Sequence, residues 1–301
     1  MENKNFFCAT ESKLGNDEQI GSASYFKKLI LLEYRLPFKE EAFAESELPQ
    51  NVKDTLNSYL SANEHTRLLL IRNPEFEQGE LSIFGINNTG KENKVNRKFI
   101  SSYEEILDID LSILFEDNSN LNHEGYLYLV CTNGTKDKCC AKLGIPIYNE
   151  FKKNRPEVTW QCSHVGGDRF APTMFTIPSC TNYGHLVKED VTSIINHEEN
   201  KAIYLDKLRG QAFLNFYEQA ATYFLRKKLR DSKLGTIIVI ESEKLDSAKF
   251  RIVLKNLDTN TQYPLVVSKI QSEYFNFMAC TSKKQSYSVK YQIEELDLVQ
   301  E

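Results

Sequence analysis

The sequence predicts an α/β protein, and three observations support this class. Extended apolar segments surround one helical segment over residues 126–186, a long amphipathic helix follows at 210–230, and short apolar segments alternate with polar turns in the rest of the chain. Apolar runs bounded by turn residues predict strands, and apolar residues three or four positions apart predict helices. We therefore expect an N-terminal α/β extension at 1–122, a central unit at 123–230 and a C-terminal β-meander at 231–301.

The N-terminal region mixes extended and helical patterns. Apolar segments at 26–36, 66–72 and 80–86 predict strands. Residues 102–115 predict a helix, because Ser101 or Ser102 can cap it and acidic residues occupy its first turn.

The central unit has a regular order of elements. The pattern predicts a strand at 126–131, a helix at 137–153, a strand at 158–162, a glycine-rich loop at 163–172, a hairpin of 174–177 and 183–186, and a helix at 188–196. A right-handed crossover would make the first two strands parallel. Strand, helix, strand, loop, hairpin and helix is the order of a thioredoxin-like unit.

The central unit ends with the amphipathic helix at 210–230, which has aromatic residues on one face. A polar stretch at 231–235 is the best linker. Five strands are expected after it, at 235–241, 250–255, 263–268, 274–279 and 287–293.

Composition restricts the classes of function. The 301 residues are 41% hydrophobic and 26% charged, which is typical of a soluble globular protein. The formal net charge of −5 argues against a nucleic-acid binder. No apolar run approaches the roughly 18–20 residues that span a bilayer, and the N-terminus does not resemble a secretory signal. A cytoplasmic location is therefore the expectation, with no membrane and no nucleic acid as partner.

The cysteines carry the strongest chemical signal. There are seven, an odd number in a chain without a recognisable signal, so a metal or redox site is expected rather than a disulfide framework. Four of them crowd the segment 131–162, beside His164. The other three, Cys8, Cys180 and Cys280, are interpreted as small core residues.

The first constellation lies between a strand and a helix. Cys131 ends the expected strand, and Cys139 and Cys140 begin the expected helix, where the helix dipole and free N–H groups favour thiolates. Successive helical residues point about 100° apart. One of the two adjacent cysteines is therefore expected to be a ligand, and the other a packing residue.

The second constellation follows the next strand. Cys162 and His164 precede two glycines, which allow close backbone approach to a bulky group, and Asp168 follows them. Imidazole on one iron of a cluster raises its potential and adds a titratable ligand. The spacing alone leaves three interpretations open: a metal or cluster site, a dithiol redox site, or no site.

The segments VCTNGTKDKCCAKLGIPIY and WQCSHVGGDRFAPTMFTIP, with NYGHL, LDKLRGQAF and the opening FFCATESKLGNDEQIGSAS, resemble the sucrase/ferredoxin-like family over at least residues 6–225. The resemblance implies a thioredoxin-like ferredoxin domain with a 2Fe–2S cluster held by two Cys and two His. It places the Cys pair at Cys131 and Cys140, and one histidine at His164. No carbohydrate-hydrolase constellation supports sucrase activity.

The sequence departs from the family at Asp168, where the related fungal ferredoxins have the second histidine. Carboxylate ligation of such clusters is uncommon. Cys162 can supply the fourth ligand, Asp168 can ligate, or Asp168 can pair with Arg169 or orient His164. We favour Cys162, because a thiol is the better ligand for iron.

Arg169 is expected either to raise the potential as an electrostatic partner of the cluster or to form a surface salt bridge. The leading hypothesis is an electron carrier or redox sensor that exchanges one electron with a reductase or acceptor protein. The alternatives are a zinc-binding or metal-free interaction module and a thiol oxidoreductase acting through Cys139 or Cys140.

Overall fold

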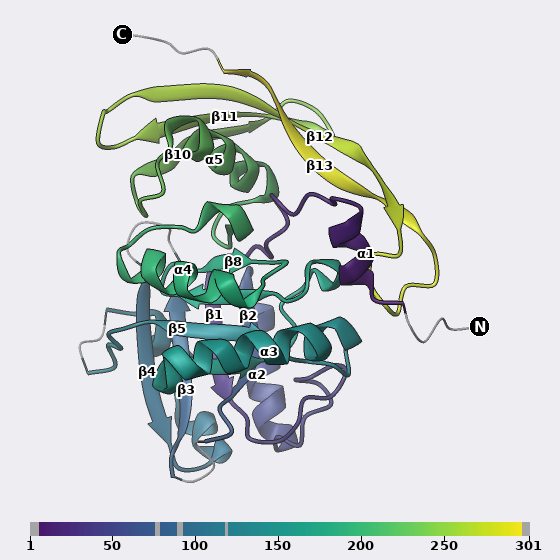
Figure 1. The fold of residues 1–301 in the computed structure, drawn as a ribbon. Helices are drawn as coiled ribbons and strands as arrows, with labels where there is room; N and C mark the ends of the chain where they lie inside the picture. Colours follow the sequence, from purple (N-terminus) through teal and green to yellow (C-terminus); the bar gives the residue numbers. More distant parts are fainter. Residues whose placement is uncertain (1–5, 76–78, 89–92, 118–119, 297–301) are drawn as a thin grey trace.

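The computed structural model describes residues 6–75, 79–88, 93–117 and 120–296 and has a mixed α/β fold built on two sheets (Figure 1). The larger sheet has nine strands in the order β4-β3-β1-β2-β6-β5-β7-β8-β9. The smaller sheet is a four-stranded antiparallel meander, β10-β11-β12-β13. Within the described part of the chain, none of the helices combines the length and apolar character needed to cross a membrane.

The N-terminal region supplies one half of the large sheet. Its elements are α1 (Cys8–Leu14), β1 (Lys28–Glu33), α2 (Gln50–Ala62), β2 (Thr66–Arg72), β3 (Leu81–Asn87) and β4 (Lys94–Ile100). Strand β1 pairs in parallel with β2 and antiparallel with β3. Its apolar run is buried on both faces, because Leu29 and Leu31 pack in one core cluster and Ile30 and Leu32 in another. Helix α2 packs on this half through Val52 and Leu56.

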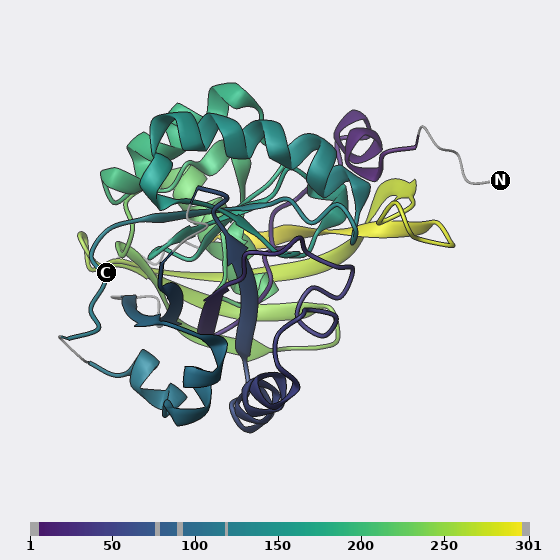
Figure 2. The same ribbon diagram turned by 90° about the horizontal axis from the view of Figure 1, so that it is seen from below.

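The central unit supplies the other half. Its elements are β5 (Leu127–Cys131), α3 (Lys138–Asn154), β6 (Thr159–Cys162), β7 (Met174–Ile177), β8 (Thr181–Tyr183), α4 (Lys188–Glu199) and β9 (Leu208–Gln211). Strands β5 and β6 are parallel, as the crossover predicted, and β7 pairs antiparallel with β5. The order of elements is that of a thioredoxin-like unit, with α3 and α4 together on one face (Figure 2).

The two halves form one continuous sheet. Strand β2 pairs antiparallel with β6, with Ile71 opposite Cys162 and Arg72 opposite Gln161. The boundary expected near residue 122 is therefore not a boundary between sheets. The pairing of β2 with β6 places a strand of the N-terminal region directly beside the strand that leads to Cys162 and His164.

The C-terminal meander packs on α5 (Phe216–Leu229), with apolar residues of the helix against those of the sheet. Its strands are β10 (Ile237–Lys244), β11 (Lys249–Asn256), β12 (Gln262–Asn276) and β13 (Ser286–Leu296). The far ends of β12 and β13 reach α1 (Figure 1). The meander thereby brings the turn after β12 to the N-terminal helix.

Four element predictions need correction. The second hairpin strand, expected at 183–186, is β8 at Thr181–Tyr183, since the turn before it ends at Cys180, whose φ is 49°. Residues 102–115 form two 3-10 turns, Tyr103–Asp108 and Leu111–Phe115, because the side chain of Asp110 accepts a hydrogen bond from Ser112 N and starts a new turn. The strand expected at 263–268 and the start of the one expected at 274–279 belong to one long strand, β12, which ends at Asn276, because β13 pairs with it from Leu265 to Asn276. The meander has four strands in the described chain, where five were expected.

The last correction concerns the helix expected from residue 210. Residues 208–211 are strand β9, and α5 begins only after Asn215. Asn215 accepts hydrogen bonds from the N–H groups of Tyr217 and Glu218, and the Glu218 carboxylate accepts from Asn215 N in return. This capping box fixes the start of the helix.

Candidate metal centre

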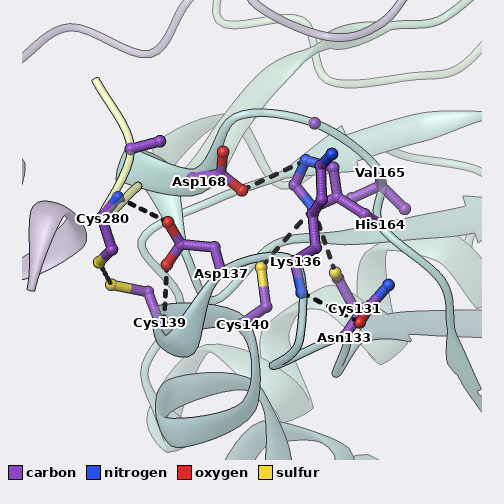
Figure 3. A network of polar contacts seen from close by, with 12 residues as sticks. Cys131, Asn133, Lys136, Asp137, Cys139, Cys140, His164, Val165, Asp168 and Cys280 are labelled. Atoms are coloured by element: carbon purple, nitrogen blue, oxygen red, sulfur yellow. Dashed lines mark hydrogen bonds and ion pairs between the residues drawn. The ribbon is translucent and has the colours of Figure 1, made fainter. Parts of the chain in front are cut away.

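Three of the predicted ligands converge at the end of the central sheet (Figure 3). Cys131 ends β5, Cys140 lies in the first turn of α3, and His164 follows β6. Nδ1 of His164 lies 3.9 Å from Sγ of Cys131 and 3.8 Å from Sγ of Cys140. All three ligand atoms lie within 4.8 Å of one another. Both thiols are buried, whereas the His164 side chain keeps 19% exposure.

The local sequence explains why the two thiols meet. Asn133 organises the turn after β5, since its side-chain oxygen accepts hydrogen bonds from Thr135 Oγ1 and Lys136 N. Asp137 then caps α3 by accepting from Cys139 N at 2.8 Å. The helix therefore begins beside the strand end, with Cys140 turned toward Cys131.

The loop after β6 positions the imidazole. Gly166 and Gly167 have φ values of 87° and 80°, in the region that favours glycine. A Cβ at Gly167 would lie 2.3 Å from Nη2 of Arg209. Arg209 is buried and donates to the carbonyl oxygens of Gly166 and Ser22, at 2.9 and 2.6 Å. The loop is thus held by a guanidinium that the sequence analysis did not single out.

Cys131, Cys140 and His164 shift one another's pKa values. Hydrogen bonding from Cys140 lowers the pKa of Cys131 well below its usual range against the opposing effect of burial, and His164 lowers it further. The same contact with Cys131, together with burial, raises the pKa of Cys140. Burial opposes the charged form of His164, but the contact with Cys131 and the charge of Asp168 raise its pKa on balance. Cys131 is therefore the thiolate of the group.

Asp168 lies on the other side of the imidazole. Its Oδ1 is 3.2 Å from Nε2 of His164, and its side chain is 18% exposed. Burial raises the pKa of Asp168 to about 6, although the charge of His164 acts in the opposite direction. The carboxylate therefore faces the ring nitrogen that points away from the thiols.

Cys162 lies in the core beside this group. It is the register partner of Cys131 across β5 and β6, and it is completely buried. Burial raises its pKa well above the usual value. Its sulfur is not among the ligand atoms that lie within 4.8 Å of one another. Its role as fourth ligand stays a prediction.

Arg169 points away from the predicted ligands. Its Nε donates to Asp17 Oδ2 at 2.6 Å, and its guanidinium lies over the ring of Phe170. Arg169 thus forms an ion pair, the alternative role expected for it, but the pair is buried and does not lie on the surface, since the Asp17 side chain is fully covered. Arg67 is closer to the group, because its Nη2 donates to the carbonyl oxygen of His164 at 2.9 Å. Desolvation lowers the pKa of Arg67, and the thiols of Cys162 and Cys131 partly offset this.

A second group of thiols lies next to the first, and the sequence analysis missed it. Cys8, Cys139 and Cys280 bring their sulfurs together beside the carboxylate of Asp137. Figure 3 shows Cys139, Cys280 and Asp137 of this group. Cys8 and Cys280 are therefore not isolated core residues, and the Cys139 sulfur contacts both of theirs. Among the cysteines interpreted as core residues, Cys180 alone stays outside both groups.

Two comparisons with known proteins find a match. A family model described as sucrase/ferredoxin-like matches residues 9–210. A search of the curated proteins finds no match. Among solved structures, a thioredoxin-like [2Fe-2S] ferredoxin from Aquifex aeolicus matches at 14% identity with a TM-score of 0.26, over 29% of this chain and 91% of its own.

Proposed function

The chain belongs to the sucrase/ferredoxin-like family, and we propose that it binds a 2Fe–2S cluster and transfers single electrons. The observation that carries the proposal is the convergence of Cys131, Cys140 and His164 at one end of the thioredoxin-like unit. Thiolate sulfur and imidazole nitrogen are the protein donors that iron–sulfur clusters use. The donor set therefore fits the group that the family name suggests.

Cys131 and Cys140 would hold one side of the cluster, and His164 the other. Cys162, whose backbone pairs with that of Cys131, is the proposed fourth ligand. A bound 2Fe–2S cluster would supply the one-electron couple. Because the two thiols are buried and His164 is partly exposed, the imidazole side is the side that a reductase or acceptor protein can approach.

We propose that Asp168 positions His164. A carboxylate beside Nε2 favours the tautomer that carries its proton there, and this leaves the Nδ1 lone pair facing Cys131 and Cys140. This role was one of three that the sequence left open. It uses the observed contact and needs no carboxylate ligand to iron.

The buried arginines would raise the reduction potential of the cluster. A cluster held by thiolates is negatively charged, and reduction adds one more electron. Arg67 and Arg209 are desolvated cations whose pKa values burial lowers, to about 9 for Arg209, and the charge of Cys131 raises both values. Their positive charge would favour the reduced state.

The test is a visible spectrum with iron and acid-labile sulfide analysis of protein purified without oxygen. We expect broad absorbance that dithionite bleaches, with equal amounts of iron and sulfide. Cys131→Ala should abolish it, and Cys180→Ala, which removes a buried thiol outside the site, should retain it. A protein that stays colourless after reconstitution would contradict the proposal, and zinc bound in place of iron would favour the interaction module. Thiol-dependent activity without iron would favour the oxidoreductase.

A further inference from the structure

Three cysteines from distant parts of the chain meet at the N-terminal end of α3. Cys8 is the first residue of α1, Cys139 lies in the first turn of α3, and Cys280 lies in the turn after β12. The sulfur of Cys8 lies 3.6 Å from that of Cys139 and 3.5 Å from that of Cys280. The sulfurs of Cys139 and Cys280 are 3.4 Å apart (Figure 3).

These distances match a shared metal ion. Zinc with Zn–S bonds of about 2.3 Å in tetrahedral geometry holds its sulfur ligands about 3.8 Å apart. A carboxylate oxygen at about 2.0 Å from the same ion would lie about 3.5 Å from each sulfur. Asp137 Oδ2 lies 3.7 Å from the sulfur of Cys8. The three sulfur–sulfur distances and this oxygen–sulfur distance thus lie within a few tenths of an ångström of the tetrahedral values, and all four ligand atoms lie within 4.8 Å of one another.

A disulfide accounts for this arrangement less well. A disulfide joins two sulfurs at about 2.05 Å and leaves the third without a role. Here the three sulfur–sulfur distances are nearly equal, from 3.4 to 3.6 Å. An ion at the centre uses all three thiols at once.

The surrounding backbone prepares the site for negative charge. Asp137 accepts hydrogen bonds from Cys139 N at 2.8 Å and Cys280 N at 2.7 Å, so its carboxylate is fixed in place. The N–H of Cys8 donates to the sulfur of Cys280 at 3.4 Å. The N-terminal end of the 17-residue helix α3, where Cys139 lies, also favours thiolates through the helix dipole. Cys8 and Cys139 are completely buried and Cys280 is partly buried, so an ion there would be largely shielded from water.

We propose that Cys8, Cys139 and Cys280, together with Asp137, bind one zinc ion. With four protein ligands the site is of the closed, structural kind. The ion would link α1, near the N-terminus, and the β12–β13 hairpin, near the C-terminus, to the start of α3 (Figure 1). Helix α3 also carries Cys140. The site uses none of the proposed cluster ligands, so the zinc proposal can be tested independently of the proposed function.

The experiment is zinc analysis of the full chain after incubation with zinc and removal of the excess. We expect one zinc per chain in the wild-type protein, and loss of that zinc in Cys8→Ser and Cys280→Ser. Cys131→Ser and Cys180→Ser should retain it. Because Cys280 lies in a partly exposed turn, Cys280→Ser should fold, and circular dichroism would verify this.

A cobalt titration gives a second measurement on the intact protein. Co²⁺ in this site should give thiolate charge-transfer bands and the intense visible bands of tetrahedral cobalt, and both should be absent from Cys280→Ser. Loss of zinc only in Cys131→Ser would place the ion at the other group and overturn the proposal. A wild-type mass lower by two hydrogens without zinc, or free thiols that bind neither zinc nor cobalt, would also overturn it.

Discussion

Cys139 and Cys140 are neighbours in the first turn of α3, yet their thiols belong to two different groups. The sulfur of Cys139 lies 3.6 Å from that of Cys8, and the sulfur of Cys140 lies 3.8 Å from Nδ1 of His164. Consecutive helical residues project about 100° apart. One helical turn therefore supplies a thiol to each group, and displacement of that turn would disturb both.

The pKa of Asp168 depends on the charges of both thiol groups. Burial is the main reason that its pKa rises to about 6, and the charges of Asp137, Cys131 and Cys280 add to the rise. These charges come from the two sides of the α3 N-terminus. A change of charge in one group is thus expected to alter the carboxylate that supports His164.

The first prediction separates the roles of Cys162 and Asp168. If Cys162 is the fourth ligand, Cys162→Ala prevents stable assembly of the cluster after reconstitution. Asp168→Asn should still assemble it, because an amide oxygen can accept from Nε2 of His164, but the cluster should be lost to a chelator about 10 times faster. Iron and sulfide content and the rate of bleaching measure the two effects. Assembly in Cys162→Ala together with failure in Asp168→Ala would reassign the fourth ligand to Asp168.

The second prediction concerns the buried charge of Arg67. Its guanidinium donates to the carbonyl of His164, so Arg67→Met removes a positive charge next to the ligands while keeping much of the side-chain volume. The reduction potential should fall by roughly 50–100 mV, which corresponds to an interaction of about 1–2 kcal/mol with the added electron. Arg155→Met, at the opposite end of α3 and paired with Glu199, is the control. Equal potentials in both variants would contradict a tuning role for Arg67.

The third prediction tests how closely α3 must approach β5. A Cβ at Gly144 would lie 2.2 Å from the carbonyl oxygen of Cys131. Gly144→Ala should therefore push the helix away and destabilise the fold by about 1–3 kcal/mol, despite the better helix propensity of alanine. It should also weaken cluster retention, because Cys140 moves with α3. Chemical denaturation and chelator-induced bleaching measure both effects, with Ile145→Ala, at an exposed position of the same helix, as control. Unchanged stability would show that the end of β5 can move to make room for the added methyl group at little cost in free energy.

The part of the site that was predictable from sequence is the part that local signals encode. Cys131 follows a run of apolar residues, and Asp137 is a helix cap, so the strand end and the helix start could be placed within one residue. The glycine pair before Asp168 likewise marked a tight loop. Each of these features depends on a few neighbouring residues.

The second thiol group could not be predicted in this way. Cys8 and Cys280 are separated by 272 positions, and their meeting depends on the packing of the β12–β13 hairpin against α1. Arg67 was missed for the same reason. Nothing in the pattern of β2 indicates that it pairs with β6 and so places Arg67 beside His164.

The last prediction concerns Glu198, a completely buried carboxyl group remote in sequence from the cysteine sites. It accepts hydrogen bonds from Thr176 Oγ1 at 2.8 Å and Tyr183 OH at 3.0 Å. Burial nevertheless raises its pKa from 4.5 to about 7. The folded protein thus binds this proton more tightly than the unfolded chain does. The resulting stability is fully present below about pH 4.5 and is lost as the pH rises through about 7.

The free energy of unfolding should therefore fall by about 2–4 kcal/mol across this window, through Glu198 alone. Glu198→Gln removes the titration, so the variant should gain stability relative to the wild-type protein as the pH rises from 4.5 to 7.5. Denaturant unfolding at several pH values measures the difference. Glu199→Gln is the matched control, since this neighbour is ion-paired with Arg155 and its pKa is lowered. Parallel stability curves for wild-type and Glu198→Gln protein would mean that Glu198 is ionised in the folded state throughout, and that its hydrogen bonds outweigh its burial.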